Sequence, residues 1–248
     1  MQPLLTFQDL SLGYDGHAAI HHLDGNVDAG ALTAIVGPNG SGKSTLLKGI
    51  VGMLRPLGGR ILRAKALQGD IAYLPQLTEI DRSFPADVFD LVALGLWKRR
   101  GMLGRISPSD RDEIDLALTA VGLSGFERRG IDTLSGGQLQ RALFARVLLQ
   151  DARLILLDEP FNAIDTRTIR DLFGIIHRWH SEKRAVLVVL HDLDLVREFF
   201  PTTLLLARRP IAWGETREAL KSENMLKARQ LNQNWDQDAP WCERSHAA

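Results

Sequence analysis

A short glycine-rich segment carries residue types that suit phosphate binding. Residues 37–45 read GPNGSGKST, which fits the pattern G-x-x-x-x-G-K-[ST] without a mismatch. Glycines let the backbone curl so that successive N–H groups point toward an anion. Lys43 can then reach the β- and γ-phosphates of a nucleotide, and the Ser44 hydroxyl can bind Mg²⁺. The predicted nucleotide-binding loop consists of Gly37, Pro38, Asn39, Gly40, Ser41, Gly42, Lys43, Ser44 and Thr45.

Two adjacent carboxylates follow an apolar run. Residues 154–157 read LILL and are followed by Asp158 and Glu159. Such a run is typical of a buried parallel strand, and ligands bind at the carboxyl ends of these strands in open sheets. Asp158 is then placed to hold Mg²⁺, and Glu159 to orient the water that attacks a phosphate. Beside a phosphate loop, we favour this interpretation over a pair of solvated acids.

A second anion-binding element is predicted at residues 134–138, which read LSGGQ. Ser135 can cap a helix that starts near Gln138, and Gly136 and Gly137 leave backbone N–H groups uncovered. A single nucleotide does not need both elements from one subunit if they face apart. We therefore expect a dimer in which ATP lies between the phosphate loop of one copy and the LSGGQ segment of the other.

The elements that position these motifs alternate between strands and helices, which predicts an α/β core with parallel strands. Apolar runs and alternation predict strands at residues 4–12, 31–36, 70–74, 154–157 and 186–190. Helical spacing of apolar residues predicts helices at residues 44–53, 84–96, 110–121, 139–150, 166–180 and 216–231.

Composition narrows the class of protein. The 248 residues include 30 basic and 30 acidic side chains, and this neutral balance argues against binding nucleic acid through charge alone. The single cysteine, Cys242, excludes an intrachain disulfide. No apolar stretch approaches the roughly 18–20 residues that cross a bilayer. We therefore expect a soluble, cytoplasmic chain.

Taken in order, the phosphate loop, the LSGGQ segment and residues 154–159 resemble the nucleotide-binding domain of ABC transporters, over roughly residues 4–230. The resemblance implies an α/β P-loop NTPase fold with an N-terminal antiparallel β subdomain and a helical subdomain at about 77–150. It implies an ATPase domain at 1–231 and a polar tail at 232–248. It also implies that ATP and Mg²⁺ are the cofactors and that ATP is hydrolysed.

The same resemblance implies roles for four further residues. Tyr14 matches the aromatic residue that stacks on adenine, with a plain strand-edge tyrosine as the alternative. Gln76 matches the glutamine that senses Mg²⁺ and the attacking water. Asp165 matches the acid of a loop that crosses the dimer interface, and His191 matches the histidine that contacts the γ-phosphate. Ile164 stands where the family usually has leucine, a mild change that we expect catalysis to tolerate.

The type of ABC protein is suggested by residues 84–95, FPADVFDLVALG. This stretch resembles the F-P-x-x-V-x-x-x-V-x-x-G pattern of ATPases that serve zinc and manganese importers. The resemblance implies a separate membrane permease, a metal-binding solute receptor and a peripheral position on the inner or plasma membrane. An iron-siderophore or cobalamin type importer is the alternative, and a soluble ABC ATPase without a permease is a further one.

The polar C-terminal tail contains Cys242 and His246, which suggests metal sensing. Their spacing matches no zinc-binding template, so we favour a solvated tail.

Overall fold

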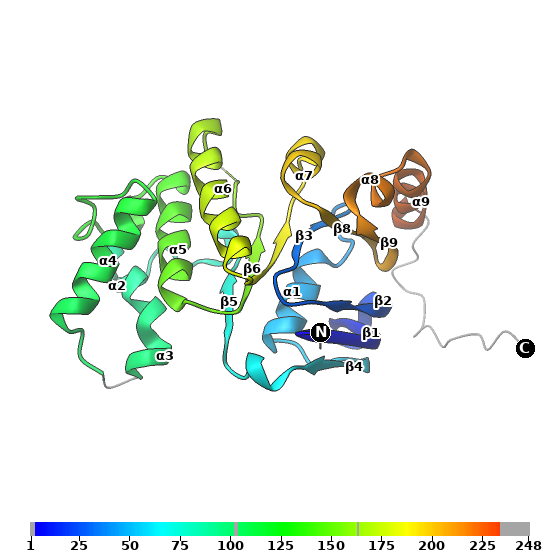
Figure 1. Cartoon of the computed structure of the whole chain (residues 1–248), viewed down its shortest axis with the longest axis horizontal. Coiled ribbons are helices and arrows are strands. Elements are labelled where there is room, and N and C mark those ends of the chain that lie inside the picture. Colours follow the sequence, from blue (N-terminus) through cyan, green and yellow to red (C-terminus); the bar gives the residue numbers. More distant parts are fainter. Residues whose placement is uncertain (1–2, 102–103, 163, 234–248) are drawn as a thin grey trace, which may run out of the picture. The chain divides into compact units, whose positions relative to one another are not determined.

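The computed structural model of this protein describes residues 3–101, 104–162 and 164–233 (Figure 1). The chain divides into two compact units. The first unit combines the chain before residue 69 with the chain after residue 186, and the second comprises residues 69–186. The phosphate loop and His191 therefore belong to the first unit. Gln76, the LSGGQ segment and the two carboxylates belong to the second.

The first unit contains an antiparallel sheet in which β1 (Leu5–Tyr14) lies between β2 (His17–Val27) and β4 (Gly58–Arg63). Asp15 and Gly16 join β1 to β2, and both have positive φ angles, 49° and 81°, as a tight hairpin turn requires. The sheet confirms the expected N-terminal antiparallel subdomain. Of its three strands, the apolar pattern of residues 4–12 predicted β1 alone.

The phosphate loop is supported by a second set of strands in this unit. The five residues of β3 (Leu32–Val36) are all buried, and β3 pairs in parallel with β8 (Thr202–Ala207). β9 (Arg209–Glu215) runs antiparallel to β8. The loop after β3 leads into α1 (Lys43–Val51), as expected for residues 44–53. The unit also contains a 3₁₀ turn (Lys65–Leu67) and α7 (Leu193–Phe199).

The C-terminal part of the first unit corrects one prediction. Residues 216–231 do not form one helix but two, α8 (Thr216–Ala219) and α9 (Ser222–Gln233). The side-chain amide of Asn224 donates to the carbonyls of Glu218 and Ala219, so that polar contacts at the end of α8 replace helix continuation. Cys242 and His246, like the rest of the tail after residue 233, lie outside the described residues.

The second unit is built on the parallel pair β5 (Ile71–Leu74) and β6 (Leu154–Asp158). Every residue of β6 is buried, as its apolar run predicts. α6 (Thr166–Ser181) follows β6, and Trp179 of this helix stacks on Phe144 with ring centroids 5.5 Å apart. β7 (Ala185–Val189) then carries the chain into the first unit.

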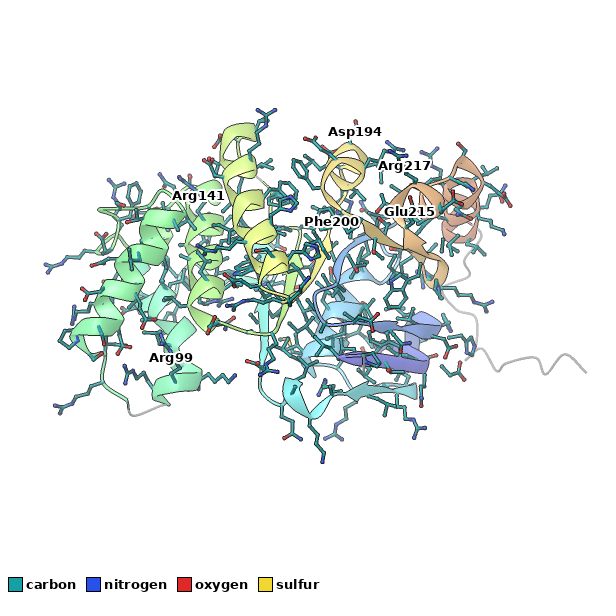
Figure 2. All side chains as sticks on the ribbon, in the orientation of Figure 1. Arg99, Arg141, Asp194, Phe200, Glu215 and Arg217 are labelled. Carbon is teal, nitrogen blue, oxygen red and sulfur yellow. The ribbon has the colours of Figure 1, made fainter. Side chains whose placement is uncertain are left out.

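The helices between β5 and β6 form the predicted helical part of the second unit. Figure 1 shows α2, α4 and α5 side by side, and α5 contacts both of the others. Arg141 lies on α5 (Figure 2) and donates to the carbonyls of Val121 and Gly122, which fixes the end of α4. The bounds are α2 (Val88–Ala93), α3 (Trp97–Arg100), α4 (Pro108–Ala120) and α5 (Gly136–Gln150), with 3₁₀ turns at Leu77–Glu79, Leu94–Leu96 and Ile131–Thr133.

Two helix starts differ from their predicted positions. The expected helix at 84–96 begins only at Val88, because Asp87 caps it by accepting a 2.8 Å hydrogen bond from the Asp90 N–H. The helix expected from about Gln138 begins at Gly136, with Ser135 as its cap. The α/β class itself is confirmed. Within the described residues, no helix is both long and apolar enough to cross a membrane.

Candidate functional site

The phosphate loop places an open helix end at its centre. Gly42 adopts a left-handed conformation (φ 96°) as the cap residue of α1. Within the described part of the chain, no side chain caps this helix, so its first N–H groups are not occupied by a capping oxygen. A helix N-terminus of this kind attracts phosphate through its N–H groups and its dipole.

Two glycines of the loop are required by close neighbours. A Cβ atom on Gly37 would lie 1.9 Å from the carbonyl oxygen of Leu206, and Gly37 has a φ of 155°. A Cβ atom on Gly42 would lie 2.5 Å from Cγ1 of Ile20. The loop is therefore packed against β2 and β8, and only glycine fits at either position without a shift of the backbone.

Lys43 reaches back over the loop that precedes it. Its Nζ atom donates to the carbonyls of Gly37 at 3.0 Å and Pro38 at 2.9 Å, and the side chain is buried. The ammonium group is therefore held against the backbone of the loop, where a phosphate can replace carbonyl oxygens as its partner.

His191 lies beside the same loop. A cavity of about 190 Å³ is lined by residues that include Gly37, Pro38, Leu190 and His191. The N–H of Leu190 donates to the carbonyl of Ile35 in β3, which fixes the start of the segment that carries His191. The first unit thus brings the predicted histidine and the phosphate loop to one cavity.

The two carboxylates predicted to act in catalysis lie in the second unit at the end of β6. Asp158 is completely buried, and Glu159 follows it with a left-handed backbone (φ 49°) that is uncommon for a non-glycine residue. The Gln76 amide donates to Oε1 of Glu159 at 2.7 Å. The Asn162 amide donates to Oε2 at 2.5 Å. Each carboxylate oxygen of Glu159 therefore has an amide donor.

The LSGGQ segment forms a complete capping box. The Ser135 hydroxyl accepts from the Gln138 N–H at 3.2 Å, and Gln138 Oε1 accepts from the Ser135 N–H at 2.9 Å. Ser135 is exposed, and Gly136 and Gly137 are partly exposed. The N-terminus of α5 is therefore well ordered and accessible to a ligand.

Two other predicted residues occupy simpler positions. Tyr14 is 46% exposed at the end of β1, opposite His17 of β2. Its ring is accessible for stacking, and its contact with adenine stays a prediction. Asp165 caps α6 by accepting from the Thr168 N–H at 3.0 Å and the Thr168 hydroxyl at 2.7 Å. This cap is a structural role in addition to the predicted one.

Magnesium was predicted at Ser44 and Asp158, with Gln76 as a further contact. Hydroxyl and carboxylate oxygens are the hard ligands that Mg²⁺ prefers, and the buried Asp158 carboxylate fits such a cation. No cluster of three or more His, Cys, Asp or Glu side chains suited to a metal occurs among the described residues. Ser44 belongs to the first unit and Asp158 and Gln76 to the second, and magnesium binding by these residues stays a prediction.

Sequence reasoning missed two contacts of the site. No role was predicted for Asn162, which donates to Glu159. None was predicted for Arg82, whose Nη2 donates to the Leu134 carbonyl beside Ser135. Asn162 follows Glu159 by three residues, a spacing at which a polar side chain can return to a turn. Arg82 carries no local signal because its partner lies 52 positions away.

The sequence matches the ABC transporter family over residues 20–162. This match covers more than half of the chain and includes the phosphate loop, the LSGGQ segment and both carboxylates. The chain belongs to the ABC transporter family. Its membership confirms the expected ATP-binding fold.

Named relatives extend the match to most of the ABC chain. This chain is 40% identical to a Chlamydia pneumoniae protein that is named as an ATP-binding protein of a metal transport system. The match extends over 226 residues, which is 90% of this chain and 87% of the relative. It is 37% identical to the manganese transport system ATP-binding protein MntA of Synechocystis over 228 residues, or 89% and 88% of the two chains. It is 37% identical to the zinc transport system ATP-binding protein TroB of Treponema pallidum over 225 residues, or 89% and 84%.

A solved structure agrees with this ABC fold. An inward-facing ABC transporter assigned to the metal-chelate type superposes with a TM-score of 0.79 at 28% identity, covering 92% of this chain and 90% of the other.

Proposed function

We propose that this ABC protein is the ATP-hydrolysing subunit of an importer for a divalent metal ion, manganese or zinc. The observation that carries the catalytic part is the ordered carboxylate of Glu159, which is held by Gln76 and Asn162 directly after the buried Asp158. Support for the metal comes from relatives that are named for manganese and zinc transport.

In the proposed reaction, Glu159 orients a water molecule and accepts its proton on a carboxylate oxygen as that water attacks the γ-phosphate. Lys43 offsets charge on the β- and γ-phosphates, and His191 contacts the γ-phosphate. Bound Mg²⁺ would neutralise phosphate charge, with Ser44 and Asp158 as its protein ligands. Gln76 holds the Glu159 carboxylate and, when it moves, changes the direction in which that carboxylate points.

The ATP-bound form is proposed to be a homodimer. Each ATP would lie between the phosphate loop of one copy and Ser135, Gly136 and Gly137 of the other. The accessible N-terminus of α5, with its capping box complete, supports this proposal. Sedimentation of the Glu159→Gln variant tests it, because ATP should convert this variant from monomer to dimer and ADP should not. A monomer at saturating ATP would contradict the proposed dimer.

The permease is proposed to bind an apolar surface of the second unit. Phe84, Leu94 and Trp97 are 64%, 47% and 54% exposed, which is high for large apolar side chains. A cavity of about 320 Å³ is lined by Leu94 and Trp97, by Asp70, and by Ile71 at the start of β5. An apolar side chain of a permease helix could fill this cavity and bury the surface.

A charge on this surface tests the proposed docking. Trp97→Asp should abolish co-purification with the permease and leave ATP binding by the isolated subunit unchanged. Leu116→Asp is the matched control, because Leu116 is 70% exposed on α4. Normal co-purification of Trp97→Asp would contradict this docking surface.

The substrate is tested with the assembled complex. ATPase activity should rise when a receptor loaded with Mn²⁺ or Zn²⁺ is added to the complex in lipid nanodiscs. Stimulation by a ferric siderophore or cobalamin would instead assign the alternative importer type. Stimulation of the isolated chain by DNA or RNA, with no permease in the complex, would favour a non-transport ATPase.

A further inference from the structure

Arg82 connects the segment after Gln76 to the LSGGQ segment. Its guanidinium Nη2 donates to the carbonyl oxygen of Leu134. Leu134 is buried and directly precedes Ser135. Both residues belong to the second unit, so this contact lies inside one compact body.

The peptide group between Leu134 and Ser135 is held at both ends. Its carbonyl accepts from Arg82, and its N–H donates to Gln138 Oε1 at 2.9 Å. The Ser135 hydroxyl accepts in turn from the Gln138 N–H at 3.2 Å. Because a peptide group is planar, fixing its two polar ends fixes the direction of the plane. That direction sets where the Ser135 side chain points at the N-terminus of α5.

The loop that carries Arg82 is itself ordered. Asp81 Oδ1 accepts from the Ser83 hydroxyl at 2.6 Å and from the Ser83 N–H at 2.9 Å, and these bonds hold the pKa of Asp81 below its ordinary value. These bonds fix the backbone turn at residues 81–83. Arg82 lies within this turn, and its side chain contacts the Leu134 carbonyl.

A backbone ladder joins the same two segments beyond Arg82. The Ile131 N–H donates to the Ala86 carbonyl at 3.0 Å, and the Val88 N–H donates to the Arg129 carbonyl at 3.0 Å. The Phe89 N–H donates to the Glu127 carbonyl at 2.9 Å. Residues 86–89 and 127–131 are therefore bound to one another, so the contact of Arg82 is not an isolated surface interaction.

We infer that Arg82 is a positioning residue for Ser135, which fixes the peptide plane that directs Ser135 toward the nucleotide of the partner copy. The inference rests on the proposed role of Ser135 in the ATP-bound dimer. Arg82 acts through the peptide group and does not need to contact the nucleotide.

The test measures ATP-driven dimerisation in the Glu159→Gln background. Arg82→Ala should raise the protein concentration at half-dimerisation by at least fivefold, because a charge-assisted hydrogen bond to the peptide group is lost. Arg82→Lys, which keeps a cationic donor, should recover part of this loss. ATP affinity at protein concentrations too low for dimers should stay within twofold, since the phosphate loop is intact.

Two controls separate positioning from general stability. Arg128→Ala removes an exposed arginine from residues 127–131, the segment that precedes Leu134, and this variant should dimerise normally. If Arg82 acts only by orienting Ser135, its loss should have no further effect once the Ser135 hydroxyl is removed. The double variant Arg82→Ala with Ser135→Ala should then be no worse than Ser135→Ala alone.

Normal dimerisation of Arg82→Ala would overturn the inference. So would additive losses in the double variant, equal losses in Arg128→Ala, or failure of Arg82→Lys to recover any dimer. A failure of the dimer proposal itself is distinguishable, because the Glu159→Gln parent would then stay monomeric at saturating ATP. A failure of the proposed role of Ser135 alone would leave Ser135→Ala dimerising like its parent.

Discussion

The side-chain amide of Gln76 donates a 2.7 Å hydrogen bond to Oε1 of Glu159, although 83 positions separate the two residues. Gln76 follows β5 after a single intervening residue, Pro75, and Glu159 directly follows β6. The parallel pairing of these strands therefore brings both side chains to one edge of the sheet. A displacement of the loop that contains Gln76 changes the surroundings of the Glu159 carboxylate.

Glu159→Gln is expected to keep nucleotide binding and to lose turnover. The amide preserves size but cannot accept the proton of the attacking water, and general bases contribute about 10²–10⁴-fold to rate. Phosphate release should fall by at least two orders of magnitude, while ATP affinity by equilibrium binding changes by less than about threefold. Turnover close to that of the unaltered protein would remove Glu159 from its proposed role.

Gln76 variants are expected to reduce turnover in a defined order. Gln76→Ala removes one donor to Glu159 and should lower kcat about tenfold, which corresponds to a hydrogen bond to a charged group. Gln76→Glu places a second carboxylate beside the first and should lower kcat further. The exposed Gln68→Ala serves as the control in the same phosphate-release assay. Equal activity of Gln76→Ala and Gln68→Ala would contradict the importance of this contact.

Gly37→Ala is expected to weaken nucleotide binding far more than Gly16→Ala. Both positions have φ angles that disfavour a side chain, 155° and 81°, but a Cβ atom on Gly16 would meet nothing within 4 Å. At Gly37 it would lie 1.9 Å from the Leu206 carbonyl, so the loop must move. ATP affinity should fall more than tenfold for Gly37→Ala and stay within about twofold for Gly16→Ala. Similar affinities would argue against a loop held by β8.

Asp110 is expected to make the second unit sensitive to acid. Its buried carboxylate accepts from Arg100 at 2.7 Å and from the Ser107 N–H at 2.8 Å, which hold its pKa well below its usual range. Because the pKa is lower in the folded state, the stabilisation is complete above the unfolded pKa of about 3.9 and is lost as pH falls toward the folded value.

Thermal unfolding tests this pH dependence. Asp110→Asn should lower the Tm by several degrees at pH 7, and the difference from the unaltered protein should shrink below about pH 4. A constant difference between pH 7 and pH 3 would show that charge on Asp110 does not contribute.

Much of the site followed from local patterns. The apolar runs of β3 and β6 placed Gly37 and Asp158 at strand ends, and Ser135 was expected to cap the helix that follows it. These features depend on neighbours within a few residues. The sequence therefore predicted the phosphate loop, the carboxylate pair and the LSGGQ helix from their local order.

Other features depend on partners that are distant in the chain. β2 contains His21, His22 and Asp24, and a pattern this polar becomes a strand only through its pairing with β1. The start of α8 depends on Thr216, whose buried hydroxyl binds the Thr203 hydroxyl and the Phe200 carbonyl. The donors to Glu159 and to the Leu134 carbonyl likewise required loop conformations that no periodicity encodes.

Metal uptake by proteoliposomes that contain this subunit, its permease and the solute receptor tests the proposed function most directly. With ATP inside the vesicle compartment that holds the subunit, Mn²⁺ or Zn²⁺ should cross the bilayer, and the rate should fall to background with the Glu159→Gln subunit. Movement of neither metal by an assembled, ATP-hydrolysing complex would contradict the proposed substrate. Equal transport by the Glu159→Gln complex would contradict the claim that ATP hydrolysis at this site drives it.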